Sequence, residues 1–204
     1  MLVGERVSLG AFVPDDYAAM FCWANDIVAA RLNGAFRPAN LRDVVSQCEV
    51  AGKDPAQVML AIRQRGQSKI LGFVHIHNIS PVHRSAEIGI RIGEEGHRGK
   101  GYGTEAMNMA LSYCWNHLNL ERISLVVFRK NERAIKVYRK VGFRQEGIMR
   151  RLFFVDGQRI DVVIMAAFRS SRTSRQRAVT IPDVALSPAI APAGQGEPAR
   201  SKAA

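Results

Sequence analysis

The 204-residue chain has few cysteines, an uneven supply of charge and no long apolar run. Its three cysteines, Cys22, Cys48 and Cys114, form neither a Cys-x-x-Cys pair nor a Cys/His cluster, which excludes a disulfide framework and a zinc site. We expect them to be reduced core residues of a cytoplasmic protein. No apolar run approaches the ~20 residues that cross a bilayer, and no secretory signal opens the sequence. The sequence therefore predicts no contact with a membrane.

Acidic residues are fewer than basic residues. Lys plus Arg number 29 against 18 for Asp plus Glu, which gives a net charge of +11. From Arg169 onward there are six basic and two acidic residues, so the end of the chain holds +4 and residues 1 to 168 hold +7. A domain this basic is expected to handle an anion: nucleic acid, an anionic surface or a phosphorylated small molecule.

The composition also divides the chain. With 47% hydrophobic residues, the chain suits one globular domain, which we place at residues 1 to 168. Residues 169 to 204 are first basic and then rich in Pro and Ala, and we predict that they form a disordered tail because they cannot bury enough apolar surface. A solvated tail without a role and a weak polyanion-binding arm both remain open.

The spacing at which apolar residues recur along residues 1 to 168 switches between two and about 3.6, which indicates a mixed α and β domain. The expected strands, about seven, are residues 7–11, 57–63, 70–79, 86–92, 123–128, 144–154 and 159–167. The expected helices, about four, are residues 14–26, 41–51, 101–118 and 131–141. The hairpin signal Asp156-Gly157 makes the last strand pair antiparallel, whereas the helical crossover after residue 92 implies a parallel pair. A mixed, mostly antiparallel sheet follows.

The most informative stretch is a strand that leads through a glycine-rich loop, His97-Arg-Gly-Lys-Gly-Tyr-Gly103, into the long helix. Such an arrangement binds pyrophosphate through backbone N–H groups at the helix N-terminus. The P-loop pattern fails because Glu94 stands where its first glycine belongs. The dinucleotide pattern GxGxxG fails because Thr104 stands in the third glycine position.

The loop does match another pattern, Arg98-x-x-Gly101-x-Gly103, which resembles the acetyl-CoA signature of the GNAT superfamily of N-acetyltransferases. Downstream, the residues from Asn131 to Phe143 are similar to that superfamily's block N-x-x-A-x-x-x-Y-x-x-x-G-F. The resemblance covers residues 2 to about 168. It is greatest for the branch that contains ribosomal-protein N-terminal acetyltransferases and spermidine acetyltransferases.

The resemblance implies a twisted sheet splayed between its fourth and fifth strands and acetyl-CoA as the co-substrate, with no metal. The pantetheine arm would pair with the strand end at Ile90, Arg91 and Ile92. Residues 98 to 104 would hold the pyrophosphate through their backbone, and Arg98 and Lys100 would add charge at the rim. The implied binding residues are Arg91, Ile92, Arg98, Gly99, Lys100, Gly101, Tyr102, Gly103, Thr104, Asn131 and Ala134.

Two residues are candidates for catalysis. Tyr138 matches the family's tyrosine near the sulfur, which implies a general acid for the departing thiolate, although its spacing alone also suits a core tyrosine. Glu87 is a candidate base if strand alternation turns it toward the splay and burial raises the pKa of its carboxyl. Glu87 as a partner for an arginine, with water taking the proton, is an alternative. Asn131 likewise suits a simple helix cap.

Several alternatives stay open. Arg133, Lys136, Arg139 and Lys140 fit either a solvated helix face or a contact to the adenosine phosphate, and His75 and His77 without a third ligand favour solvent over metal. The leading hypothesis is direct acetyl transfer to a primary amine: a polyamine, an amino sugar, an aminoglycoside or a protein N-terminus. Residues 14 to 54 hold six acids and four bases, too slight an excess to identify a polycationic acceptor. A nucleic-acid module, which the motifs disfavour, and a CoA sensor are the alternatives, and a homo-oligomer is possible.

Overall fold

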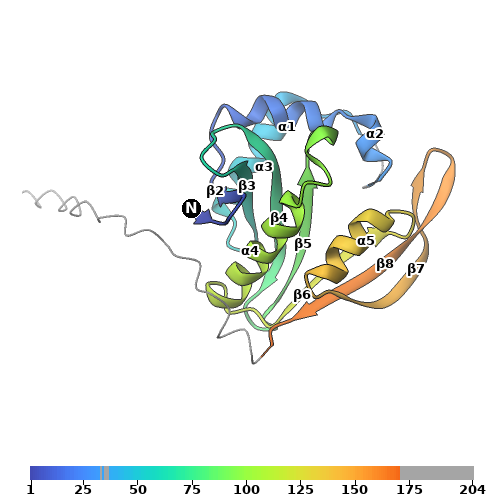
Figure 1. Ribbon diagram of the computed structural model, residues 1–204. Coiled ribbons are helices and arrows are strands. Elements are labelled where there is room, and N and C mark those ends of the chain that lie inside the picture. The colour runs from blue at the N-terminus through green and yellow to red at the C-terminus, as the bar shows by residue number, and fades with distance from the viewer. Residues whose placement is uncertain (33, 35–36, 171–204) are drawn as a thin grey trace, which may run out of the picture.

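The computed structural model describes residues 1–170 except for 33, 35 and 36. Within these residues one eight-stranded sheet has the strand order β1-β2-β3-β4-β5-β6-β8-β7 (Figure 1). The strands are β1 (Leu2–Val3), β2 (Val7–Gly10), β3 (Val58–Gln64), β4 (Ile70–Ser80), β5 (Ser85–Ile92), β6 (Arg122–Phe128), β7 (Arg144–Val155) and β8 (Gln158–Phe168). The helices are α1 (Asp16–Ala24), α2 (Ile27–Ala30), α3 (Leu41–Lys53), α4 (Tyr102–Asn116) and α5 (Glu132–Lys140), with the short 3-10 helix η1 (Glu95–His97).

The mixed, mostly antiparallel sheet confirms the predicted fold class, with one strand and one helix more than expected. Neither β1, with two residues, nor α2, with four, is long enough to show a period in the sequence. Within the described residues, the parallel pair is β5 with β6, as predicted, and every other pairing is antiparallel. The predicted tail lies outside the described residues from residue 171 onward, so the domain boundary at 168 stays a prediction.

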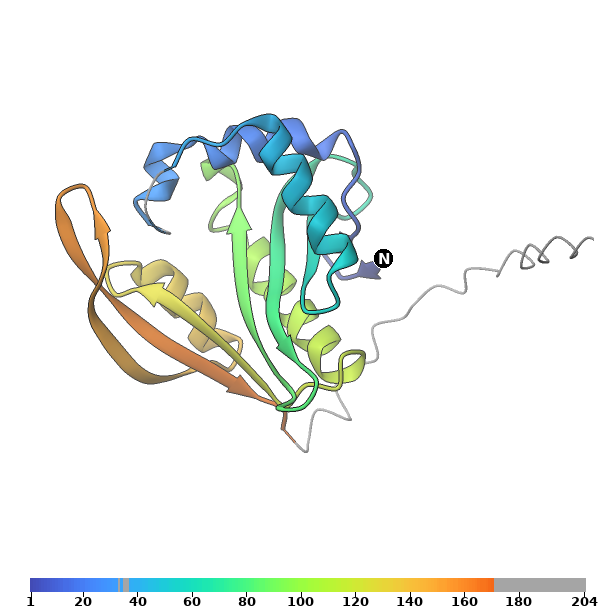
Figure 2. The same ribbon diagram turned by 180° about the vertical axis from the view of Figure 1, so that it is seen from behind.

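Helices cover both faces of the sheet. The main core, under α4 and α5, buries apolar residues of β2, β4, β5, β6 and β8, with Met107 of α4 and Ile123 of β6 fully enclosed. On the opposite face, α1 and α3 pack over β3 and β4 around Met20, Trp23 and Val44. Figure 2 shows α3 in front of the sheet and α4 behind it. Among the described residues, no helix is long and apolar enough to cross a membrane.

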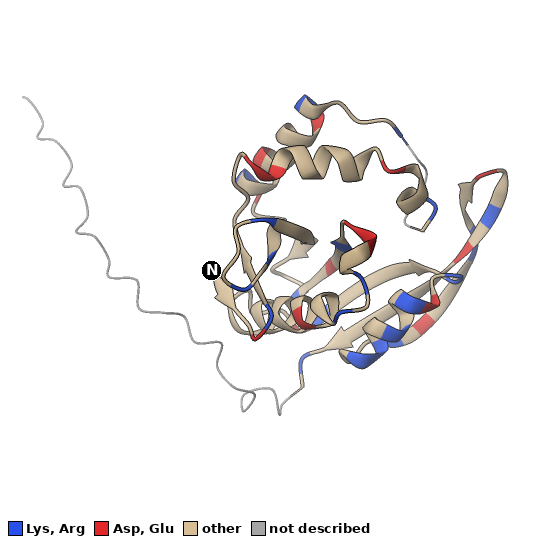
Figure 3. Cartoon of the chain, turned by 45° about the horizontal axis from the view of Figure 1, so that its top comes forward, with Lys and Arg blue, Asp and Glu red and all other residues tan. Residues whose placement is uncertain are grey.

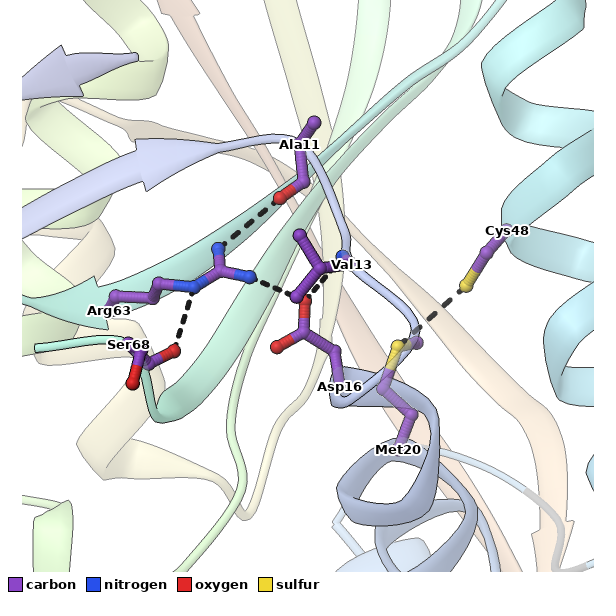
Figure 4. Close-up of polar contacts among 7 residues, drawn as sticks. All are labelled: Ala11, Val13, Asp16, Met20, Cys48, Arg63 and Ser68. Carbon is purple, nitrogen blue, oxygen red and sulfur yellow. Dashed lines mark hydrogen bonds and ion pairs between the residues drawn. The ribbon is translucent and has the colours of Figure 1, made fainter.

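A buried ion pair anchors α1 to β3 (Figure 4). The Arg63 guanidinium contacts the Asp16 carboxylate at 2.5 Å, and the two side chains are 10% and 3% exposed. Arg63 also donates to the carbonyls of Ser68 and Ala11, and the Asp16 carboxylate accepts from the backbone N–H of Val13. Because every charged group here has hydrogen-bond partners, the pair can be buried.

The cysteine prediction needs one correction. Cys48 and Cys114 are buried and Cys22 is exposed, because it lies on the outer face of the short helix α1 while Met20 and Trp23 face the core. All three thiols are free. Burial raises the pKa of Cys114 to about 12, so that thiol stays protonated at neutral pH.

Candidate active site

The sheet separates at the parallel pair. β5 and β6 pair only at Ser85 with Arg122, Ala86 with Ile123, and Glu87 with Ser124, so their remaining residues diverge. A gap opens on the far side of these pairs, between Ile92 at the end of β5 and Phe128 at the end of β6. This is the splay that the resemblance implied between the fourth and fifth expected strands.

A cavity of about 780 Å³ extends into the splay, a volume typical of small-molecule sites. The ends of β5 and β6, the loop before α4, and α5 supply most of its walls. Of the residues predicted from the sequence, those that line it are Arg91, Ile92, Arg98, Gly99, Gly101, Gly103, Thr104, Asn131, Ala134 and Tyr138.

Three predicted residues lie elsewhere. Lys100 and Tyr102 line a separate, shallower depression with Arg6, on another side of the loop. Glu87 sits where β5 and β6 are still paired, and its carboxylate accepts a hydrogen bond from Asn78 at 3.0 Å. The alternation of β5 turns Glu87 away from Ile88 and Ile90, which face the core under α4. The structure therefore does not bring Glu87 to the cavity.

The glycine-rich loop presents backbone donors at the start of α4. Gly101 caps the helix with φ +86°, and Gly99 has φ +84°, a conformation that glycine adopts without strain. No acceptor for the N–H groups of residues 99 to 104 exists among the residues that the structure describes. Successive unpaired N–H groups at a helix N-terminus form a site that can bind an anion such as a phosphate.

Neighbouring side chains hold this loop in place. Arg98 donates to the carbonyls of Ile92 and Gly93, at 3.3 and 3.0 Å, so its guanidinium closes the loop onto the end of β5 as well as lining the cavity. Arg6 donates to the carbonyl of Lys100, and the Glu105 carboxylate accepts from the Arg6 backbone N–H. Gly93 packs against the Trp23 indole so closely that a Cβ atom would overlap the ring.

The basic face of α5 turns toward the cavity. Arg133, Lys136 and Lys140 line it, whereas Arg139 does not. Figure 3 shows the concentration of Lys and Arg on this helix. Asn131 caps α5, since its Oδ1 accepts from the Ala134 N–H at 3.2 Å, and it lines the cavity as well. Of the two readings of this face, solvated surface or phosphate contact, the geometry is compatible with the second.

Tyr138, on α5, belongs both to the hydrophobic core and to the lining of the cavity. Its side chain is buried, with 8% exposure, and its ring packs against Phe143. Burial raises the pKa of its hydroxyl to about 12. No described residue forms a hydrogen bond with this hydroxyl. The group is therefore a protonated donor at neutral pH.

Two buried nitrogen atoms on the cavity wall lack a hydrogen-bond partner among the described residues, Arg91 Nε and His97 Nδ1. Glu94 Oε2 lies 3.5 Å from His97 Nδ1 without the direction of a hydrogen bond. The Arg91 guanidinium donates to the Trp23 carbonyl. Burial lowers the pKa of Arg91, and the Asp26 carboxylate opposes that shift.

Sequence reasoning missed the apolar part of the lining. These residues come from segments far apart in the chain: Ala29, Leu32, Val126, Phe128, Phe153 and Val162. No local sequence pattern marks them: Val126, for example, is an apolar strand residue whose 45% exposure appears only in the folded chain.

Comparisons with known proteins agree with this geometry. A family model described as an acetyltransferase (GNAT) domain matches residues 6–144. The spermidine N(1)-acetyltransferase of Escherichia coli K12 is 41% identical over 98 residues, which cover 48% of this chain. The match spans about half of that relative, 52% of its length.

Solved structures extend the likeness over most of the chain. Spermidine N-acetyltransferase from Vibrio cholerae, in complex with CoA and spermine, is 27% identical with a TM-score of 0.74, and the match covers 79% of this chain and 95% of that one. A dodecameric structure of the same enzyme has a TM-score of 0.68 at 27% identity and covers 79% and 93% of the two chains. The chain therefore belongs to the GNAT acetyltransferase family.

Proposed function

We propose that this protein transfers the acetyl group of acetyl-CoA to a primary amine by direct attack in a ternary complex. The observation that carries the proposal is the continuity of one cavity past the unpaired N–H groups of the glycine loop, the splayed strands and the Tyr138 hydroxyl. This arrangement suits a long co-substrate with a charged diphosphate at one end and a thioester at the other.

The residues divide the binding of acetyl-CoA between them. The N–H groups of residues 99 to 104 would hold the diphosphate, and Arg133, Lys136 and Lys140 would supply charge for the phosphates. The backbone of Ile90 to Ile92, which lacks a β6 partner, would pair with the pantetheine amides. The thioester would then lie in the splay beside Tyr138.

Transfer needs one bond formed and one broken. The neutral amine attacks the thioester carbonyl, the carbon–sulfur bond breaks, and Tyr138 gives its proton to the departing thiolate. The amine's proton leaves to water or to Glu87, which would have to act through water because it does not line the cavity. A covalent cysteine intermediate is not part of the proposal, since none of the three cysteines lines the cavity.

The relatives support an amine as the acceptor. Two of them are named for spermidine, and the same site could instead take an amino sugar, an aminoglycoside or a protein N-terminus. The dodecamer of one relative supports self-association of this chain as well. Light scattering of the purified protein would test that second point, and a monomer at all concentrations would contradict it.

The activity is tested by incubating the full chain with acetyl-CoA and a panel of amines and peptides, with detection of released CoA thiol and mass spectrometry of the products. An acetylated amine formed in step with free CoA is the expected result. A parallel titration with DNA addresses the nucleic-acid alternative. Tight, steeply salt-dependent DNA binding without any acetyl-CoA binding would overturn the proposal, and CoA binding without transfer to any amine would favour a sensor.

A further inference from the structure

The cavity has two chemically different ends. The basic end is formed by Arg98, Arg133, Lys136 and Lys140, beside the glycine loop. The apolar end is formed by Ala29, Leu32, Val126, Phe128, Phe153 and Val162. Phe128, Phe153 and Val162 belong to a small cluster that is separate from the core under α4 and α5, and the two phenylalanine rings lie 5.3 Å apart.

The apolar end lies where an acceptor would enter. CoA would occupy the basic end and reach the splay with its thioester, so the attacking amine must come from the remaining open part of the cavity. That part is bounded by α2 and by the β7–β8 hairpin, which the ion pair of Arg31 with Asp156 connects at 2.7 Å. Figure 1 shows α2 and this hairpin facing each other across the end of the splay.

Carboxylates are scarce in this cavity. Among the described lining residues Glu132 is the acidic one, and it belongs to the first turn of α5, at the basic end. Residues 33, 35 and 36, which the structure does not describe, are Asn, Ala and Phe in the sequence, and none of these residue types is charged. Of the β5 residues that line the cavity, Arg91 is the charged one, and its charge is positive.

The acidic residues that precede β3 serve the fold instead. Asp16 pairs with Arg63 (Figure 4), and Asp26 caps α2 by accepting from the N–H groups of Val28 and Ala29. Asp43 accepts from the N–H of Asn40 at the start of α3. Asp54 likewise holds the turn before β3, through Ala56 and Gln57. None of the six acidic side chains between residues 14 and 54 lines the cavity, although the Asp26 carboxylate acts on the Arg91 guanidinium from outside it.

We infer that the acceptor is a primary monoamine with an apolar body, and that polyamines are disfavoured. The inference rests on the proposed function. A polycation that leaves water at this end would meet the Arg91 guanidinium and no carboxylate among the described lining residues, whereas an apolar body gains from burial against Val126, Phe128 and Phe153. The nearby positive charge also favours the neutral form of the single amine, which is the nucleophile.

The experiment measures kcat/KM of the full chain at saturating acetyl-CoA for 2-phenylethylamine and for spermidine. We expect the ratio to favour 2-phenylethylamine at least tenfold. An equal or greater kcat/KM for spermidine would overturn the inference while leaving the acetyltransferase proposal intact. So would preference for an amino sugar or a peptide N-terminus. Absence of both acetyl-CoA binding and transfer would instead overturn the proposed function itself.

Charge variants then locate the effect. Val126→Asp places a carboxylate on the apolar end at a side chain that is already 45% exposed, and it should shift the ratio toward spermidine about tenfold. Val126→Asn has nearly the same shape without the charge, and Val82→Asp adds the same charge at an exposed valine outside the cavity. Val82→Asp should leave the ratio within twofold, and Val126→Asn, which loses the same apolar contact without gaining the charge, should shift the ratio much less than Val126→Asp does. An unchanged ratio in Val126→Asp, with acetyl-CoA affinity retained, would show that acceptors do not bind here.

Discussion

Tyr138 combines burial with a hydroxyl that borders the cavity, and this combination determines what the residue can do. Desolvation disfavours the phenolate, so the pKa of the hydroxyl rises to about 12. The hydroxyl therefore keeps its proton at neutral pH and is available as a donor to the thiolate that forms as the carbon–sulfur bond breaks. The same burial also explains why spacing alone could not separate a catalytic tyrosine from a core one.

Tyr138→Phe should lower kcat about 100-fold and leave the KM for acetyl-CoA within twofold, because it removes only the proton donor. The raised pKa predicts no loss of wild-type kcat through ionisation of Tyr138 between pH 8 and pH 10. Steady-state kinetics over this range provide the measurement. Full turnover in the variant, or an alkaline loss near pH 10 that the variant abolishes, would refute the assigned role.

Gly101 tests the anion-binding loop. Its φ of +86° would strain an alanine by about 1 kcal/mol, and a Cβ atom would lie 2.8 Å from Arg6 Nη1. Gly101→Ala should therefore weaken acetyl-CoA binding five- to tenfold by calorimetry. Gly96→Ala is the matched control, since that glycine lies in η1, just before the loop, and has open space around its Cα. Equal affinities in the two variants would argue against the loop as the diphosphate site.

At the scale of elements, the helix α4 and its preceding loop were the most predictable part of the chain. The apolar spacing of three and four, the glycines and the strand before them are all local features, and local sequence decides them. The splay was expected only through the family resemblance. It depends on how β5 and β6 are held apart by what packs on each, which no local pattern records.

The anchoring of α1 is an element-scale property that stability measurements can test. Asp16→Asn should lower the free energy of unfolding by about 3 kcal/mol, because it leaves the largely buried Arg63 without its counter-charge. Asp15→Asn changes the exposed neighbour, which forms no side-chain cap, and should cost less than about 0.5 kcal/mol. Urea denaturation of both variants gives the comparison, and similar midpoints would contradict the role of the pair.

At the scale of the whole molecule, only the folded chain shows which surface the excess of basic residues occupies. Lys136 and Lys140 line the cavity, whereas Arg139, on the same helix, does not. The Lys136→Gln/Lys140→Gln double variant should weaken acetyl-CoA binding about tenfold at 50 mM salt, and less at 500 mM, because salt screens exposed charges.

Arg139→Gln is the control on the same helix and should change the affinity by less than twofold. Calorimetric titrations at both salt concentrations distinguish the two faces. A double variant that binds as tightly as the wild type would indicate that the basic face of α5 is only a solvated surface.

The sequence by itself determined the order of the seven longer strands and four longer helices, the glycine loop at the start of α4, and the family to which these motifs belong. Each of these depends on residues close together in the chain, whose spacing is set by backbone geometry. Tertiary structure alone decided that Glu87 stays outside the cavity, that the acids before β3 cap and anchor helices, and that α2, β6, β7 and β8 supply an apolar end. These outcomes depend on packing between distant segments, and neither charge counts nor periodicity contains that information.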